Sequence, residues 1–462
     1  MYDAAVTTRD EYAHAAPGKS PVGAALVFLY LVGIYTHVTV FVAPGIPWPA
    51  AAAGLAGILL FIKNAYRIHI RHVAPIFLFV LIGLFSMLFA PDSISLLGER
   101  AQSLLLLTYS LVVGYGLYLE LVQWRRGKVA RLFFVVSTLI LIGCALENFT
   151  AFGAISDSFR GAVFPEEFLY VANLRDQSLF GMVRPKLFTA EPSFVAIFFV
   201  FSITIWLVLS ASPLRFVSYF LFLAVGLFLI RSPVLLIGAV TGGAACFAPA
   251  SSGPRAVGAA SLNKIVLVGL ALGVGAVFLY VALTTVLSER LDVILSGSDD
   301  SFTIRVIAPI VIAWETITRY PFFGAGIGGR EAILDIILQT YLPIVVRLDH
   351  IYYKLVYGIT SVFWLHWIFF GLVGGSLALL AIVKLMRCLG GGPLMFPAIV
   401  ILSFSHTMGA YVGPRFWSIF FIVLAATYLA RQPPTPTGNK MQWITRAGHP
   451  ATQRLPTSHR GC

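Results

Sequence analysis

The chain has 462 residues, of which 58% are apolar and 11% are charged, and its mean hydropathy is +0.88. This composition excludes a soluble globular protein, which could not bury so much apolar surface, and it predicts an integral membrane protein. The net charge of +12 does not indicate nucleic-acid binding, because the basic residues stand in short connections between apolar runs, where they set membrane orientation.

Residues 1–21 are polar and precede a full-length apolar run without a small-residue cleavage site. We therefore expect a cytoplasmic N-terminal segment followed by an uncleaved first span. The four cysteines, at positions 144, 246, 388 and 462, show no metal-ligand spacing, and two of them lie inside apolar runs. Neither a disulfide framework nor a metal site is indicated.

A helix needs about twenty apolar residues to cross the hydrocarbon layer. By that measure residues 22–430 form an all-α, polytopic bundle of about twelve spans. These are expected near 22–43, 46–63, 73–90, 103–122, 132–150, 193–210, 215–230, 233–249, 265–286, 359–384, 393–411 and 414–430. The alternative for one of the two shorter ones, at 46 or 233, is a partial span. Lys and Arg gather in the connections 63–72 and 123–131, which predicts that both termini are cytoplasmic.

Two connections are much longer than the others, and both fall on the outer side. They are residues 151–189 and 288–357, in which aromatic and charged residues alternate with runs of helical period. Long loops in a compact bundle are usually functional or disordered, and this composition favours an ordered periplasmic helical layer. The tail 431–462, rich in Pro, Thr and Arg, is predicted to be a disordered, basic cytoplasmic extension.

The first candidate motif runs from Arg184 through Lys186 to Glu191-Pro192-Ser193. Pro192 suits the first turn of a helix, so the positive end of the helix dipole faces outward beside two cations. Such an arrangement predicts an anion site. The alternative is that Glu191 only complements the dipole while the cations anchor to lipid phosphate.

The second motif begins with Arg305, which precedes apolar residues at helical spacing and then Pro321 and the glycines between 324 and 329. The spacing predicts an amphipathic helix at the outer interface. No strand is expected before the glycines, so a dinucleotide fingerprint is not indicated. The alternative is that Arg305 is simply an exposed charge on this helix.

The third motif surrounds His350, where His350, Tyr353, Lys354 and Tyr357 share one face if the segment is helical. A histidine there can act as a general base near neutral pH. The alternative is an interfacial aromatic belt. Lesser candidates, for which a core or headgroup role is the alternative, are Arg231, Arg415, His37, His366 and His406.

The three motifs lie on one predicted membrane face, and in their order the chain resembles the superfamily of bacterial O-antigen polymerases and O-antigen ligases, including exopolysaccharide repeat-unit polymerases. The resemblance rests on Arg184 with residues 188–193, on Arg305 ahead of residues 321–328, and on His350 with its tyrosines. Glu191-Pro192-Ser193 is more similar to the polymerases than to the ligases. Arg231-Ser232-Pro233 departs from the family pattern of Ser-Arg followed by small residues.

The resemblance implies a glycosyltransferase of the bacterial inner membrane that uses no metal or other cofactor. Its donor is a glycan on undecaprenyl pyrophosphate, and membrane lipids and a chain-length regulator are further candidate partners. It implies that Arg184, Arg305, Lys186 and Arg231 contact the pyrophosphate and that His350 is the base, with Glu191 as the alternative. The same resemblance suggests, as further candidates, that Tyr353 and Tyr357 contact the glycan.

Three functions stay open at this point. A polymerase transfers the glycan to a lipid-linked repeat unit, whereas a ligase transfers it to lipid A core. The third function, from another class, is a secondary transporter or flippase of lipid-linked glycans. A transporter is expected to carry ionisable or helix-breaking residues near mid-membrane, whereas here the charged motifs gather at one face.

Overall fold

The computed structural model describes residues 21–43, 46–166, 169–171, 173–212, 214–248, 269, 273, 275–296, 302–342, 358–390 and 393–432. The part of the chain that the structure describes is mostly helical, with almost no strand. The predicted all-helical character is therefore confirmed. One short hairpin of two strands, β1 (Val40–Ala43) and β2 (Ile46–Trp48), is the exception within the described ranges.

Among the described residues, five helices are long and apolar enough to cross a membrane: α3 (Ile70–Phe89), α4 (Leu97–Leu121), α5 (Arg126–Phe149), α8 (Pro192–Leu209) and α17 (Val362–Gly390). Shorter apolar helices accompany them: α1 (Pro21–Thr36), α2 (Ala51–Lys63), α9 (Arg215–Ile230), α10 (Leu236–Ala244) and α18 (Met395–Ser405). The last helix is α19 (Pro414–Arg431). These lengths and compositions support a membrane protein.

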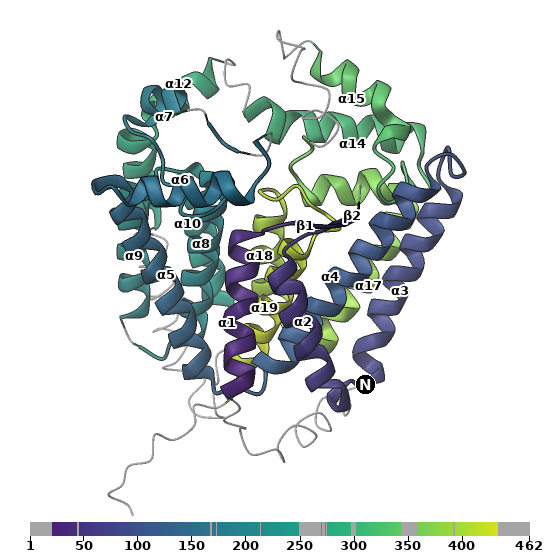
Figure 1. The fold of residues 1–462 in the computed structure, drawn as a ribbon, viewed down its shortest axis with the longest axis horizontal. Coiled ribbons are helices and arrows are strands. Elements are labelled where there is room, and N and C mark those ends of the chain that lie inside the picture. The colour runs from purple at the N-terminus through teal and green to yellow at the C-terminus, as the bar shows by residue number, and fades with distance from the viewer. Residues whose placement is uncertain are drawn as a thin grey trace, which may run out of the picture.

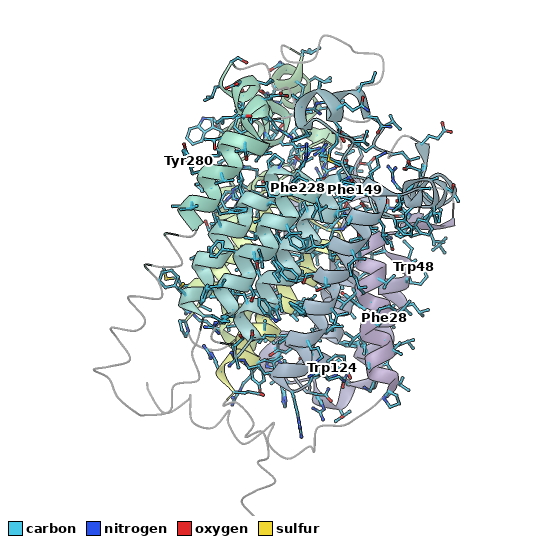
Figure 2. The ribbon with its side chains drawn as sticks, turned by 90° about the vertical axis from the view of Figure 1, so that its left-hand side faces the viewer. Phe28, Trp48, Trp124, Phe149, Phe228 and Tyr280 are labelled. Carbon is cyan, nitrogen blue, oxygen red and sulfur yellow. The ribbon has the colours of Figure 1, made fainter. Side chains whose placement is uncertain are left out.

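The helices form one bundle with the helices side by side (Figure 1). In that view α5, α8, α9 and α10 stand on the left and α2, α3, α4 and α17 on the right, with α1, α18 and α19 between them. Helix α4 packs on α2 and α19, α5 packs on α8, and α3 packs on α17. Figure 2 shows Trp124 toward the lower end of the bundle and Phe149 and Phe228 toward the upper end.

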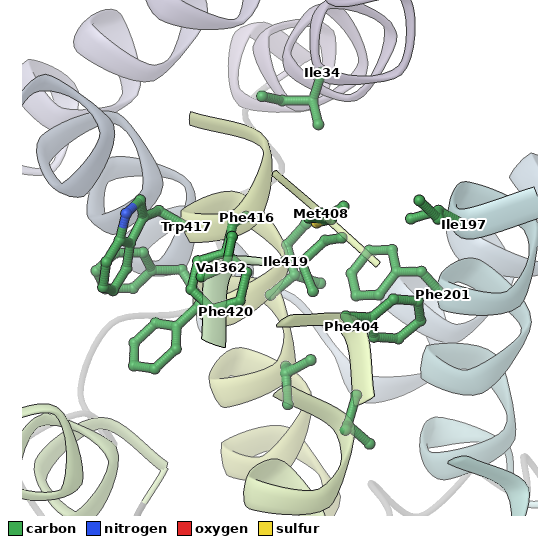
Figure 3. Close-up of a cluster of buried hydrophobic side chains, with 14 of the residues drawn as sticks. Ile34, Ile197, Phe201, Val362, Phe404, Met408, Phe416, Trp417, Ile419 and Phe420 are labelled. Carbon is green, nitrogen blue, oxygen red and sulfur yellow. The ribbon is translucent and has the colours of Figure 1, made fainter. Parts of the chain in front are cut away.

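The core of the bundle surrounds α19. Its Trp417 is 1% exposed, and Figure 3 shows it in a cluster of apolar side chains from several helices. The labelled members are Ile34, Ile197, Phe201, Val362, Phe404, Met408, Phe416, Trp417, Ile419 and Phe420. Because most of its surface is covered by protein, α19 is apolar all round rather than on one stripe.

The first expected span, residues 22–43, is shorter in the structure and ends at Thr36. His37 takes a left-handed φ of 55°, which ends the helix, and the hairpin follows. The next helix begins at Ala51 rather than near residue 46. Pro47 and Pro49 explain this delay, because they have no amide hydrogen to donate within a helix.

Both long outer connections contain helices, which lie above the bundle in Figure 1; we call this layer the canopy. The first connection contributes α6 (Phe152–Val163) and α7 (Asn173–Phe180), and the second contributes α12 (Ser288–Leu295), α14 (Ala308–Arg319) and α15 (Leu334–Tyr341). A π-helical turn, η7 (Thr303–Ile307), leads into α14 and carries Arg305.

The glycine-rich segment fastens the canopy to a break in α17. At Gly371 the backbone leaves helical geometry (φ 63°, ψ −167°). The amide of Leu372 donates to the carbonyl of Pro321 at 2.7 Å, and the amide of Ala325 donates to that of Ile368 at 2.8 Å. Backbone groups freed by the break are thus satisfied by the segment that follows α14.

Candidate functional site

Residues 184–191 form an irregular strap beneath the canopy, immediately before α8. Arg160 on α6 holds one end of it, donating from Nε to the carbonyl of Thr189 at 2.8 Å and from Nη2 to that of Ala190 at 3.1 Å. Arg160 is 4% exposed and also pairs with Asp157. A buried guanidinium shared between carbonyls and a carboxylate fixes the course of the strap.

The middle of the strap has unusual backbone geometry. Leu187 and Phe188 have φ values of 36° and 62°, a region that side-chain-bearing residues rarely adopt. The Glu147 carboxylate at the end of α5 accepts from the amide of Lys186 at 3.0 Å and from that of Leu187 at 2.7 Å. These hydrogen bonds hold Leu187 and Phe188 in a backbone conformation that is unfavourable on its own.

Arg184 and Lys186, both predicted to contact an anion, are buried at the base of the canopy. Arg184 is 8% exposed and donates from Nε to Asp176 Oδ1 at 2.9 Å and from Nη2 to the Tyr170 hydroxyl at 2.9 Å. Its Nη1 donates to no acceptor in the described part of the chain. Arg184 is thus paired within the protein and still presents one terminal nitrogen.

Lys186 is 4% exposed. Its ammonium donates to Asn173 Oδ1 at 3.2 Å and lies 3.6 Å from Asp157 Oδ1. The strap therefore presents its cations toward α6 and α7, where carboxylates already balance part of their charge.

Three arginines meet at Phe180, the last residue of α7; we call Phe180 with Arg184, Arg231 and Arg290 the Phe180 cluster. The guanidinium carbons of Arg184 and Arg290 lie 4.6 and 5.6 Å from the centre of the Phe180 ring. Nη1 of Arg231 donates to the Phe180 carbonyl. Arg231 ends α9 in a left-handed conformation, which aims its side chain at α7.

Glu191 and Arg305, far apart in sequence, come together in the structure. Glu191 is the residue before the first turn of α8, and its Oε2 lies 3.7 Å from Nη2 of Arg305. The two side chains are 36% and 45% exposed. The Ser193 hydroxyl donates to the same carboxylate oxygen at 2.9 Å. Two of the three predicted motifs therefore meet at the end of α8 that lies toward the canopy.

Arg415, at the start of α19, lies beside the first turns of α8. It is 7% exposed, and its guanidinium lies 3.8 Å from the centre of the Phe194 ring. Phe194 follows Glu191 by three residues in α8. An arginine of the canopy, Arg305, and an arginine of the bundle, Arg415, thus both lie near the start of α8.

The third motif lies outside the described residues: His350, Tyr353 and Tyr357 all fall in 343–357. Among the lesser histidine candidates, His366 has a core role. Its Nδ1 is 2.9 Å from the Tyr411 hydroxyl and its Nε2 is 2.9 Å from the Gly375 carbonyl. Within the described ranges, no group of three or more His, Cys, Asp or Glu side chains is arranged to hold a metal ion.

Sequence reasoning did not find Asp176, Arg290 or Phe180. Asp176 stands eight residues before Arg184, and an acid so close to a basic motif was a usable signal. For Arg290 and Phe180 the sequence gives no comparable signal, since they belong to different outer connections. Comparison of the chain with protein-family models, with curated proteins and with solved structures returned no match.

Proposed function

We propose that this chain is an integral-membrane glycosyltransferase that polymerises lipid-linked repeat units at the outer face of a bacterial inner membrane. One observation carries the proposal: Glu191 and Arg305, from separate outer connections, lie 3.7 Å apart at the start of α8. A carboxylate and a guanidinium at one exposed point suit the transfer of a sugar from an anionic leaving group.

The proposed topology has about twelve spans with both termini in the cytoplasm. Helix α2 ends at Lys63 and α5 begins at Arg126, and these ends of the two helices lie opposite the canopy in Figure 1. Placing these basic ends inside satisfies the bias of Lys and Arg toward the cytoplasm. The canopy and Glu191 then face the outer side.

In the proposed reaction an acceptor hydroxyl oxygen attacks the anomeric carbon of the donor's reducing-end sugar. The bond between that carbon and the phosphate oxygen breaks, and the pyrophosphate leaves on its lipid with the bonding electron pair. The hydroxyl proton passes to His350, or to Glu191 as the alternative base. Direct displacement inverts the anomeric centre.

Arg305 is proposed to stabilise the leaving pyrophosphate. Its pairing with Glu191 is long and largely exposed, and exposed ion pairs contribute only about 0–1 kcal/mol. A pyrophosphate with more charge can therefore displace the carboxylate from Arg305. Arg184, Lys186 and Arg231 are proposed as further pyrophosphate contacts. Two of them, Arg184 and Arg231, belong to the Phe180 cluster.

The nearest alternative is a ligase that transfers the chain to lipid A core. Deletion separates the two functions, because loss of a polymerase leaves single repeat units, whereas loss of a ligase leaves long chains on the lipid carrier. A transporter of lipid-linked glycans is the alternative from another class, and the break in α17 at Gly371 is the observation that favours it. That break is filled by the glycine-rich segment, which favours a fixed anchor over a substrate site.

The test replaces Arg305 by alanine in a strain that lacks the chromosomal gene. We expect the rate of polymer formation to fall about a hundredfold or more, because a donor that contacts developing charge is removed. Polymer length and yield are read by gel electrophoresis, and transfer is measured with a lipid-linked repeat unit on the purified protein.

Arg319→Ala is the matched control. Arg319 also belongs to the canopy and is 43% exposed, but it pairs with Asp335 away from Glu191. It should retain wild-type polymer length. The proposal is wrong if Arg305→Ala and His350→Ala both leave polymer length and yield unchanged, or if the purified protein moves the lipid-linked glycan across vesicles without joining units.

A further inference from the structure

Four arginines of the described chain are buried: Arg100, Arg160, Arg184 and Arg415. The first three each donate from a terminal guanidinium nitrogen to a protein acceptor. Arg100 reaches the carbonyl of Ala325 at 2.8 Å, Arg160 that of Ala190 at 3.1 Å, and Arg184 the Tyr170 hydroxyl at 2.9 Å. Such bonds offset the cost of taking the charge out of water.

Arg415 differs from these three. Its only hydrogen bond to a described residue runs from Nε to the carbonyl of Ile34, at 3.4 Å. Neither Nη1 nor Nη2 donates to a described acceptor, and neither is among the fully enclosed atoms that lack a partner. Both therefore face accessible space, although the residue as a whole is 7% exposed. A guanidinium held in this way is prepared for an acceptor from outside the chain.

The ring of Phe194 fixes the plane of the Arg415 guanidinium. The distance of 3.8 Å from guanidinium carbon to ring centre is that of a close cation–π contact. Phe194 lies one turn of α8 after Glu191, so Arg415 of the bundle and Arg305 of the canopy both lie near the start of α8. Two guanidiniums and one carboxylate in this region leave excess positive charge.

A histidine near Arg415 also has a ring nitrogen without a described hydrogen-bond partner. His37 has a left-handed φ of 55°, and its buried Nε2 has no described hydrogen-bond partner. It follows directly after α1, whose Ile34 carbonyl receives the bond from Arg415. His37, just after α1, and Arg415, on α19, thus both keep side-chain nitrogens without a described hydrogen-bond partner.

We infer that Arg415 is an anion contact on the membrane side of the site, and that it binds the lipid-proximal phosphate of a polyisoprenyl pyrophosphate. This assignment rests on the function proposed above, because the lipid chain of such a donor lies in the bilayer while its glycan projects outward. Arg305 then binds the phosphate on the glycan side. A planar guanidinium grips phosphate by two parallel hydrogen bonds.

Two other ligands also present a phosphate to Arg415, and the experiment must distinguish them from undecaprenyl pyrophosphate. An ordinary anionic phospholipid presents a phosphate at the same depth, and free inorganic pyrophosphate presents one from water. The wild-type protein in nanodiscs of phosphatidylcholine is therefore titrated with undecaprenyl pyrophosphate, with phosphatidylglycerol, with inorganic pyrophosphate and with undecaprenol. Binding is read by native mass spectrometry, without any transfer reaction.

The variants are Arg415→Gln and Arg415→Lys, with Arg319→Gln as the control that removes a charge from the same face. We expect Arg415→Gln to weaken binding of undecaprenyl pyrophosphate about tenfold or more, the scale of hydrogen bonds to a charged group. Arg415→Lys should recover only part of it, since an ammonium lacks the planar fork. Undecaprenol should bind weakly to all proteins, and Arg319→Gln should match wild type.

Several results would overturn the inference. These are equal binding by wild type and Arg415→Gln, equal competition by phosphatidylglycerol, and Arg415-dependent binding of inorganic pyrophosphate alone. Melting temperatures of both Arg415 variants show whether α19 still packs, and Arg415→Lys carries the test if Arg415→Gln does not fold. Arg415-dependent binding without glycosyl transfer would refute the proposed function alone, whereas transfer with unchanged binding would refute this inference alone.

Discussion

Buried arginines at the canopy end of the bundle have different roles, which depend on what their nitrogens contact. Arg160 donates to strap carbonyls and holds backbone, whereas Arg184 pairs with the fully buried Asp176. Removing one partner of a buried pair leaves an uncompensated charge, which costs more than losing both. The structural and functional parts of Arg184 can therefore be separated by experiment.

Asp176→Asn should destabilise the fold by about 3 kcal/mol, because the Arg184 guanidinium keeps its charge and loses its carboxylate. The double variant Asp176→Leu with Arg184→Met should regain much of that loss. Melting temperature in detergent measures both effects. If the double variant folds but no longer forms polymer, Arg184 contacts substrate as well. An unchanged melting temperature for Asp176→Asn would show that the pair does not support the fold.

The meeting of Glu191 and Arg305 was foreseeable, because both residues flank apolar helices on the same predicted face. The pairing of Arg184 with Asp176 was not foreseeable. Sequence spacing predicts an anion site at Arg184, but it cannot tell an external anion from Asp176, which α7 places against the guanidinium. The sequence indicates Arg415 only as a lesser candidate. Its interest lies in two terminal nitrogens that donate to no described acceptor, and sequence spacing cannot reveal this.

The strap is an element held by its contacts rather than by periodic hydrogen bonds. Its left-handed residues Leu187 and Phe188 persist because Glu147 accepts from two successive amides and the Ser156 hydroxyl accepts from a third. Strain of this kind costs on the order of 1–3 kcal/mol per residue. Local opening of the strap should therefore respond strongly to the loss of one acceptor.

Glu147→Gln should loosen the strap with little effect on the rest of the bundle. The amide group replaces one acceptor oxygen by a donor that faces a backbone N–H, so one hydrogen bond is lost and a clash of donors is added. Hydrogen exchange at Lys186 and Leu187 should become about tenfold faster or more, an opening free energy lowered by about 1.4 kcal/mol. If both amides exchange at the same rate in Glu147→Gln as in wild type, this account is wrong. The amides within α8 serve as the internal control.

Helix lengths show where hydropathy misleads at the scale of the element. The stretch from Val40 to Trp48 is apolar enough to extend two predicted spans, yet it forms a hairpin. A sliding window registers apolar residues but not the prolines that prevent a helix. Helix α2 has 13 residues, about 20 Å at 1.5 Å per residue. A helix of this length fits the partial span considered at 46–63, whereas the first expected span, 22–43, ends early at Thr36.

The glycine-rich segment ties the α14 part of the canopy to the bundle, because it is hydrogen-bonded into the break in α17. Gly324 has a φ of +59°, and a Cβ on it would lie 2.2 Å from the carbonyl oxygen of Ile368. Arg100 adds a second tie from α4, through the Ala325 carbonyl. Helix α14 packs on α17, and η7 with Arg305 precedes α14 directly. The position of Arg305 over Glu191 thus depends on how closely this segment approaches α17.

Gly324→Ala should therefore impair stability and function together. The left-handed backbone and the clash with a carbonyl that cannot move freely should cost about 2 kcal/mol or more. The separation of α14 from α17 should also weaken the meeting of Arg305 with Glu191, so polymer formation should fall even where folded protein is recovered. Melting temperature and polymer yield per folded molecule measure the two effects.

Gly98→Ala is the matched control, because Gly98 lies in α4 with nothing within 4 Å of the added carbon. It should be neutral or slightly stabilising, since alanine favours a helix. A Gly324→Ala protein with lower melting temperature but full activity would show that Arg305 keeps its place without this contact. Full activity together with an unchanged melting temperature would mean that the close approach of Gly324 to Ile368 does not fasten the canopy to α17.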